Sequence, residues 1–227
     1  MYTKFKEIEE SKMKCLIITA YIKNLDMVRD RINAEKFDFC ICADGGYKHA
    51  KTLGITPDLI IGDFDSAGVP GDFPVDNIII LPKEKDITDT DAALAKAVEL
   101  GAEEIFMLST MGGRLDHTLG VLAIIAKNYS PSMKIKIFDG QNETFMLRNS
   151  SARIPSSRIS GSGYQYMSLV SYSPYCYGVT ESGVKYPLWD ATLSNEMTLG
   201  ISNEITEDYA DVSVGKGDML VILSKDI

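Results

Sequence analysis

The first 140 residues alternate between short apolar runs and stretches with a helical period. The apolar runs are continuous, which is typical of strands buried on both faces of a parallel sheet. We expect strands at residues 14–20, 37–43, 58–62, 77–81, 104–109 and 134–140. The stretches between them predict helices at residues 25–35, 47–54, 89–100 and 117–129. This order indicates a mostly parallel α/β sheet with helices on both faces.

One helix start is marked clearly. Thr88 directly precedes the helix expected at 89–100, and Asp91 follows three positions later. A threonine with an acidic residue at this spacing is typical of a helix N-cap, so we expect Thr88 to cap the helix.

The pattern changes at about residue 141. No long helical period follows, and Gly, Ser, Tyr and Pro separate short alternating runs. These runs predict strands and hairpins within 166–172, 178–188 and 210–224, the last with a turn at 215–218. We therefore expect an α/β domain at 1–140 and an antiparallel β domain at 141–227, with the boundary somewhere in 140–163.

Composition narrows the class of partner. The 227 residues are 45% hydrophobic, and 23 basic against 32 acidic residues give a net charge of −9 without any basic run. This balance argues against nucleic acid as a partner but not against a nucleotide, because carboxylates can hold a metal ion that binds phosphates. No apolar stretch approaches the about 20 residues of a membrane span. The charged start before Met13 lacks the apolar core of a secretory signal, so we expect a polar extension on a cytoplasmic protein.

The cysteines suggest no metal site. No pair of the four has C-x-x-C spacing, and only two histidines are available. We expect Cys15, Cys40, Cys42 and Cys176 to be buried free thiols.

Carboxylates and glycines follow four consecutive expected strands. They are Asp44-Gly45-Gly46, then Gly62-Asp63-Phe64-Asp65-Ser66, then Asp86, Asp89 and Asp91, and finally Gly112, Gly113, Arg114, Asp116 and His117. Because ligands of an open parallel sheet bind beyond the carboxyl ends of its strands, we expect these residues to converge on one rim.

Asp63 and Asp65 stand out within this set. Two carboxylates this close repel each other, so a cation should lie between them, either an arginine, a lysine or a metal ion. Their spacing suits a hard cation, and we favour a metal over helix capping or turn formation.

Each remaining feature also has a structural interpretation. Asp44-Gly45-Gly46 alone is more often a turn than a nucleotide contact, and Asp89 can simply favour the helix dipole. Arg114 can pair with the carboxylates, although the glycines before it also suit close approach to phosphate. We expect His49, His117 and Trp189 to be structural. No Walker loop, G-x-G-x-x-G or H-E-x-x-H sequence occurs.

With these residues assembled, the chain from about Met13 to the end resembles the bacterial thiamine pyrophosphokinases. The resemblance rests on "ADGG", "PDLIIGDFDS", "DITDTDAAL", "GGRLDH", "GVKYPL" and "GISNE", whose order and spacing together are highly specific. It implies transfer of pyrophosphate from ATP to thiamine, giving thiamine diphosphate and AMP. It also implies an α/β domain joined to a β-sandwich, and a homodimer with its active site between subunits.

The resemblance assigns roles to individual residues. Asp63, Asp65 and Asp89 resemble the family's Mg²⁺ ligands, and Arg114 and Asp116 flank the phosphates and the acceptor. The implied nucleotide-binding set is Asp44, Gly45, Gly46, Thr88, Gly113 and Arg114. Ser202 and Asn203 match the family's thiamine-site pair, and Tyr186 stands where some members carry a tryptophan that stacks on thiamine.

Two other functions use parts of the same pattern. A metal-dependent nucleotide phosphohydrolase would need the aspartates but no second pocket at Tyr186, Ser202 and Asn203. A non-catalytic thiamine or nucleotide sensor would have little use for three metal-binding carboxylates.

Overall fold

The computed structural model describes residues 12–22, 25–65, 68–71, 77–109, 111, 113–157 and 163–226. Within them lies a nine-stranded sheet in the order β4-β3-β2-β1-β5-β6-β7-β13-β9. Its parallel part consists of β1 (Lys14–Ile18), β2 (Phe39–Ala43), β3 (Leu59–Gly62), β4 (Ile78–Ile80), β5 (Glu104–Leu108) and β6 (Lys134–Phe138). The expected strands are therefore confirmed, each one or two residues shorter than the apolar run that predicts it.

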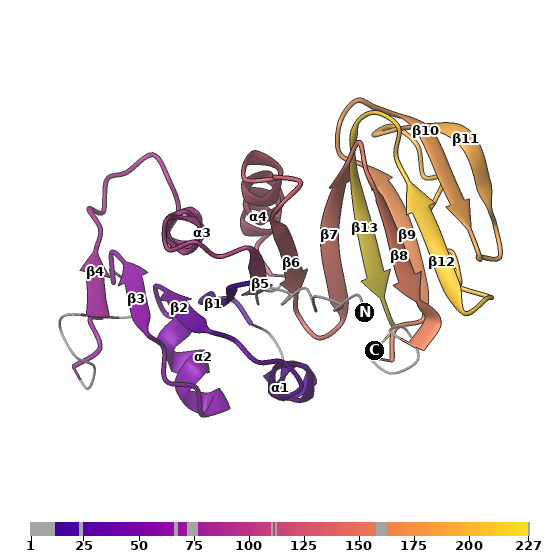
Figure 1. Ribbon diagram of the computed structural model, residues 1–227. Coiled ribbons are helices and arrows are strands. Elements are labelled where there is room, and N and C mark those ends of the chain that lie inside the picture. Colours follow the sequence, from indigo (N-terminus) through magenta and orange to yellow (C-terminus); the bar gives the residue numbers. More distant parts are fainter. Residues whose placement is uncertain are drawn as a thin grey trace, which may run out of the picture.

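Four helices cover the parallel part. They are α1 (Leu25–Asn33), α2 (Gly46–Leu53), α3 (Asp89–Glu99) and α4 (Leu115–Lys127). In Figure 1, α1 and α2 lie on one face of the sheet and α3 and α4 on the other. Neighbouring strand residues divide accordingly: Leu16 and Ile18 enter one buried cluster, whereas Cys15 and Ile17 enter the other. This explains why the strand sequences are continuously apolar.

The sheet continues past β6 with antiparallel strands. β7 (Asn142–Arg148) pairs with β6 and β13 (Asp218–Ser224), and β13 pairs with β9 (Tyr166–Ser171). A second sheet has the order β11-β10-β12-β8, formed by β8 (Ser151–Pro155), β10 (Tyr175–Ser182), β11 (Leu188–Ser194) and β12 (Tyr209–Ser213). Leu147 and Val221 of the first sheet and Val179 and Val212 of the second share one buried cluster. The two sheets thus form the expected antiparallel sandwich (Figure 1).

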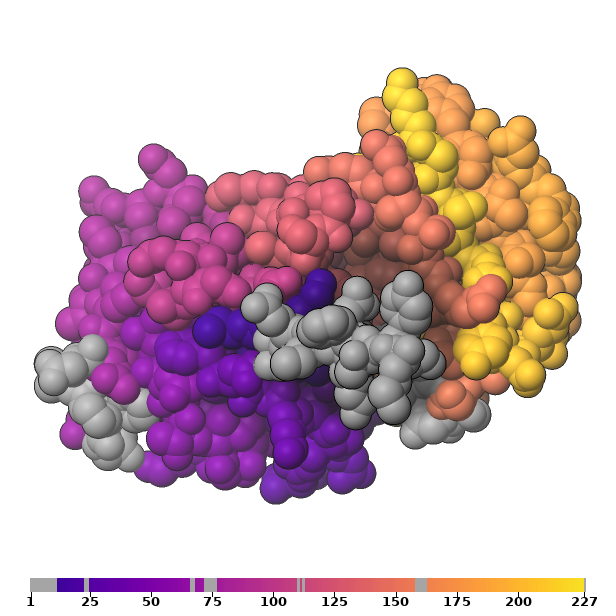
Figure 2. Space-filling model, viewed as in Figure 1, coloured from indigo at the N-terminus to yellow at the C-terminus, as the bar shows by residue number. Residues whose placement is uncertain are grey.

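The division at residue 140 falls between two paired strands. β6 and β7 pair from Lys136 with Phe145 to Phe138 with Glu143, so the main sheet crosses the expected boundary without a break. In Figure 2 the later residues, coloured orange to yellow, nevertheless gather on one side of the molecule, and the earlier residues, coloured indigo to magenta, on the other. The division into 1–140 and 141–227 stays a prediction, but the boundary region itself contains two strands, β7 and β8.

The local expectations have mixed outcomes. Thr88 caps α3 and accepts a hydrogen bond from the Asp91 amide at 3.2 Å, as predicted. All four cysteines are buried and free. The packing role expected for Trp189 is wrong, because its side chain at the start of β11 is 69% exposed. None of the described helices is long and apolar enough to cross a bilayer.

Gly46 is required where α2 begins. A Cβ atom at Gly46 would lie 2.1 Å from the Ile18 carbonyl oxygen at the end of β1. We expect Gly46→Ala to lower the free energy of unfolding, measured by urea denaturation, by about 1–3 kcal/mol, because the backbone of β1 or the start of α2 must move to accommodate the methyl group. The control is Gly120→Ala in α4, where a Cβ meets no atom within 4 Å and alanine should stabilise the helix. Equal stability of the two variants would contradict this packing constraint.

Candidate functional site

Three carboxylates meet at the carboxyl ends of the parallel strands. Asp44 follows β2, Asp63 follows β3, and Asp89 opens α3 after β4. One oxygen of each lies within 4.8 Å of the others, and all three side chains are half-buried. We call Asp44, Asp63 and Asp89 the acidic cluster. It is the only such group of potential metal ligands among the residues that the structure describes.

The backbone brings the cluster together. Asp44 adopts a φ of 44°, a left-handed conformation that aspartate tolerates better than most residues, and its amide donates to the Ile61 carbonyl at 2.8 Å. A Cβ at Gly62 would lie 2.9 Å from the Asp44 Cα, so glycine there permits the close approach. The cap at Thr88 then places Asp89 at the first position of α3.

A lysine lies inside the acidic cluster. The Lys85 ammonium is 2.5 Å from Asp63 Oδ2 and 3.1 Å from Asp89 Oδ1. A lysine is one of the three cations considered from the sequence, and this one bridges Asp63 and Asp89, while the metal favoured there stays a prediction. Sequence reasoning missed Lys85, which stands within "PKEKD" among several charged residues without any spacing signal.

Charge compensation within the cluster is incomplete. The hydrogen bond from Lys85 holds the pKa of Asp63 below its ordinary value. Burial raises the pKa of Asp89 despite Lys85, and repulsion from Asp63 and Asp44 adds to this rise. The buried Oδ1 of Asp44 accepts no hydrogen bond from the described residues. Asp89 Oδ1 likewise accepts no hydrogen bond from the described residues, although it is ion-paired with Lys85. Three carboxylates with two such oxygens fit a hard divalent cation.

Asp65 lies outside the acidic cluster. Phe64 is buried at a φ of 55°, and the resulting turn lets the Asp65 amide donate to Asp63 Oδ1 at 3.2 Å while the Asp65 side chain is exposed. The structure thus places Asp44 where the sequence suggested Asp65. The assignment of Asp65 as a metal ligand stays a prediction.

Arg114 and Asp116 form an exposed pair on the same rim. They flank the start of α4 after β5, two strands away from β2 in the sheet. Arg114 binds Asp116 through Nε at 3.2 Å and Nη2 at 2.6 Å. Asp116 takes two of its five N–H donors and Tyr21 interacts with a further one, so at least two remain for another group. A Cβ at Gly113 would lie 3.0 Å from the Tyr21 ring, while Gly112 and Ser66 fall outside the described residues.

The two histidines have structural contacts. His49 Nε2 lies 2.9 Å from the Ala20 carbonyl oxygen, and the His117 ring lies 5.1 Å from the Tyr21 ring. Both contacts agree with the structural role expected from the sequence.

Tyr186, on the loop between β10 and β11, meets Asn203, whose backbone pairs with Met167 of β9. The Asn203 side chain accepts from the Tyr186 amide at 3.0 Å and donates to the Tyr186 carbonyl at 2.9 Å. Its Oδ1 also accepts from the Glu204 amide at 3.0 Å. Asn203 is buried and almost fully used by these main-chain bonds, whereas Tyr186 is 63% exposed and Ser202 is exposed at a φ of 58°. Asn203 therefore fixes the loop that presents the Tyr186 ring.

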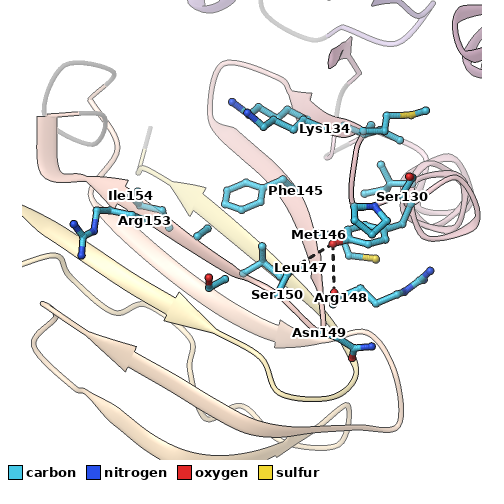
Figure 3. Close-up of a pocket in the computed structure, with 18 residues that line it drawn as sticks. Ser130, Lys134, Phe145, Met146, Leu147, Arg148, Asn149, Ser150, Arg153 and Ile154 are labelled. Atoms are coloured by element: carbon cyan, nitrogen blue, oxygen red, sulfur yellow. Dashed lines mark hydrogen bonds between the residues drawn. The ribbon is translucent and has the colours of Figure 1, made fainter. Parts of the chain in front are cut away.

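A cavity of about 370 Å³ lies elsewhere, between the end of α4 and the strands β6 to β8 (Figure 3). Tyr129 closes one side, with its hydroxyl 3.4 Å from the Arg148 carbonyl and 3.3 Å from Ser150 Oγ. Lys134 lines it at the amino end of β6, opposite to the end where the acidic cluster lies. None of the predicted site residues lines this cavity, so we assign it no part in the site.

The fold and the acidic rim define the class: an α/β protein with a ligand site at the carboxyl ends of its strands, extended by an antiparallel sandwich. Residues 32–137 match the family described as "Thiamin pyrophosphokinase, catalytic domain", and residues 153–218 match "Thiamin pyrophosphokinase, vitamin B1 binding domain". The thiamine pyrophosphokinase of Bacillus subtilis is 31% identical over 190 residues, covering 82% of this chain and 87% of the relative. This chain belongs to the thiamine pyrophosphokinase family, which confirms the resemblance seen in the sequence.

Solved structures agree with this assignment. The crystal structure of the Bacillus subtilis thiamine pyrophosphokinase has a TM-score of 0.80 at 27% identity, covering 94% of this chain and 100% of that one. The Geobacillus thermodenitrificans thiamin pyrophosphokinase has a TM-score of 0.78 at 29% identity, with 94% and 98% covered.

Glu181 is an unusual member of the second sheet, because it is fully buried and neither carboxylate oxygen has a hydrogen bond from the described residues. Burial raises its pKa from 4.5 to about 7, and the Asn203 amide works against this rise. A folded-state pKa above the unfolded value gives stability that is complete below about pH 4.5 and is lost as the pH rises through 7.

We expect wild type to lose stability relative to Glu181→Gln between pH 5 and pH 8, by up to about 3 kcal/mol. Urea unfolding of both proteins at several pH values measures this difference. Exposed Glu196→Gln serves as the control and should follow wild type at every pH. Parallel profiles for wild type and Glu181→Gln would show that Glu181 does not titrate in this range.

Proposed function

We propose that this chain transfers the pyrophosphoryl group of ATP to the hydroxyl of thiamine, giving thiamine diphosphate and AMP. The observation that carries the proposal is the acidic cluster, at the rim where an α/β sheet binds ligands, in a member of the thiamine pyrophosphokinase family. The net charge of −9 and the buried free thiols support a cytoplasmic protein that does not bind nucleic acid.

The acidic cluster would hold Mg²⁺. Asp44, Asp63 and Asp89 offer three oxygens, and Asp65 is close enough in sequence to add a further contact through water. A bound Mg²⁺ supplies positive charge to the phosphate oxygens as the pyrophosphoryl group is transferred. The residues themselves orient the ion and, since they are half-buried, limit its access to water.

The nucleotide would lie along the same rim. The turn Asp44-Gly45-Gly46 leads into α2, whose N-terminal amides and dipole favour an anion. Thr88 and Gly113 belong to turns on either side, and Thr88 contributes by fixing the start of α3. Arg114 can keep its contacts with Asp116 and Tyr21 and still donate to a phosphate, because at least two of its N–H groups remain.

Thiamine would stack on Tyr186. The exposed ring already attracts the Lys185 ammonium, which lies 5.6 Å from the ring centroid, and thiamine carries a positive charge of the same kind. Ser202, the residue before Asn203, offers an exposed hydroxyl to thiamine. We assign Asn203 to positioning the Tyr186 loop.

These residues point to a homodimer with shared sites. In Figure 1, β3 and β4 lie at one end of the chain, and β10 and β11, which flank the Tyr186 loop, lie at the other. One chain therefore keeps the acidic cluster and Tyr186 apart. A second chain can bring its own Tyr186 to the rim of the first, as a two-fold dimer would do at both sites.

Incubation with ATP, Mg²⁺ and thiamine should give AMP and thiamine diphosphate in equal amounts, and only with a divalent metal. Asp44→Asn and Asp63→Asn should each reduce kcat at least about 100-fold, since each removes one oxygen charge from the ion. Products are measured by chromatography. ADP with thiamine monophosphate would indicate an ordinary kinase, and phosphate release without thiamine would indicate the phosphohydrolase.

The shared site is tested by mixing two inactive chains, Asp63→Asn and Asn203→Ala, under conditions that exchange subunits. Half of the dimers are then mixed, and each mixed dimer has one intact site, so that activity should return to about a quarter of wild type. Asp44→Asn mixed with Tyr186→Ala, assayed at low thiamine, is a second pair that leaves the Asn203 hydrogen bonds intact. No recovery in either pair after proven exchange would mean that each site is built within one chain.

A further inference from the structure

Lys85 is held more firmly than a surface lysine. It lies on the loop between β4 and α3, and its side chain is 13% exposed. Besides Asp63 and Asp89, its ammonium donates to the Pro82 carbonyl at 3.1 Å. Two of its three N–H donors therefore have acceptors, Asp63 and the Pro82 carbonyl, and the contact with Asp89 is an ion pair.

Lys85 and a metal ion would need the same carboxylates. Asp63 and Asp89 are two of the three members of the acidic cluster, and the Lys85 ammonium is in contact with both. An ammonium and a divalent cation at these oxygens would repel each other at short range in a half-buried site, which makes joint occupancy unfavourable. The two cations must therefore exchange.

Replacing the Lys85 ammonium with a divalent metal ion balances the negative charge of the three carboxylates better. Without a metal, one positive charge faces three carboxylates, and Asp44 Oδ1 has no hydrogen-bond partner among the described residues. A divalent ion supplies two charges to the same three groups and can reach Asp44 as well. Lys85, on a loop at the same rim, can then turn toward the incoming phosphates without leaving the site.

We propose that Lys85 is an internal cation that occupies the metal position of the free chain, and that metal binding displaces its ammonium from Asp63 and Asp89. The inference rests on the proposed metal site and adds a residue to it. Lys85 thus keeps the carboxylates together when no metal is bound and competes with the metal for them.

Lys85→Met tests the competition, with Mn²⁺ as the probe and its binding followed by electron paramagnetic resonance. We expect the variant to bind Mn²⁺ about tenfold more tightly than wild type, a change equivalent to about 1.4 kcal/mol. Its melting temperature without metal should fall, because three carboxylates then lack their cation. Lys83→Met is the matched control: it removes the same charge from the same loop, but Lys83 is exposed. Its Mn²⁺ affinity should stay within about twofold of wild type.

A labelling experiment follows the displacement directly. Lysine acetylation of wild type, read by mass spectrometry, should modify Lys85 slowly without metal and several-fold faster with saturating Mn²⁺. Lys83 should react at the same rate in both states. A merely structural lysine would neither weaken metal binding nor become reactive when metal is added.

The outcomes separate the two proposals. If wild type binds Mn²⁺ but Lys85→Met binds it no more tightly and Lys85 stays protected, Lys85 is not displaced and only this inference is wrong. If wild type binds no Mn²⁺ at all, the metal site is wrong, and the role of Lys85 is wrong with it.

Discussion

Repulsion among Asp44, Asp63 and Asp89 is the constraint on which the site depends. Three neighbouring carboxylates at one rim are unfavourable unless a cation accompanies them, and here Lys85 is 2.5 Å from one and 3.1 Å from another. The fold supplies the rigidity that such an arrangement requires. Asp44 and Asp63 directly follow the buried strands β2 and β3, Asp89 opens α3, and the close contacts at Gly62 and Gly46 leave the strand ends little room to separate.

The same rigidity bears on how the β-sandwich can contribute to a site at the acidic cluster of the α/β part. The main sheet runs unbroken from β4 to β9, so the sandwich stands at a fixed place relative to the acidic cluster. The two candidate subsites lie at opposite ends of the chain (Figure 1), which is why the proposed site is shared between two chains. The buried Asn203 contributes by fixing the loop on which Tyr186 is exposed, so that the ring is presented outward, toward such a partner.

The parallel half could be predicted closely because its signals are local. Continuous apolar runs mark β1 to β6, and the Thr88 cap sets α3 to the residue. β7 and β8 could not be read in the same way, since β7 carries buried Glu143 and Thr144 and borders a polar turn. Their strand character comes from pairing with β13 and β12, which are more than fifty residues away. Pairing at this distance leaves no periodic trace in the segment itself.

The site was predictable in kind but not in detail. Sequence shows that carboxylates follow neighbouring strands, and parallel topology then places them on one rim, which is why Asp63 and Asp89 were foreseen. It does not show side-chain direction after a turn: the buried Phe64 leaves Asp65 exposed, and Asp44 closes the cluster from the adjacent strand. Lys85 was invisible for a related reason. The loop between β4 and α3 carries several charged residues. The one that turns inward is the one that can reach the unpaired carboxylates, and their positions are known only once the chain has folded. The sequence therefore indicates that the aspartates need a cation, but only the folded structure shows that Lys85 is in contact with them.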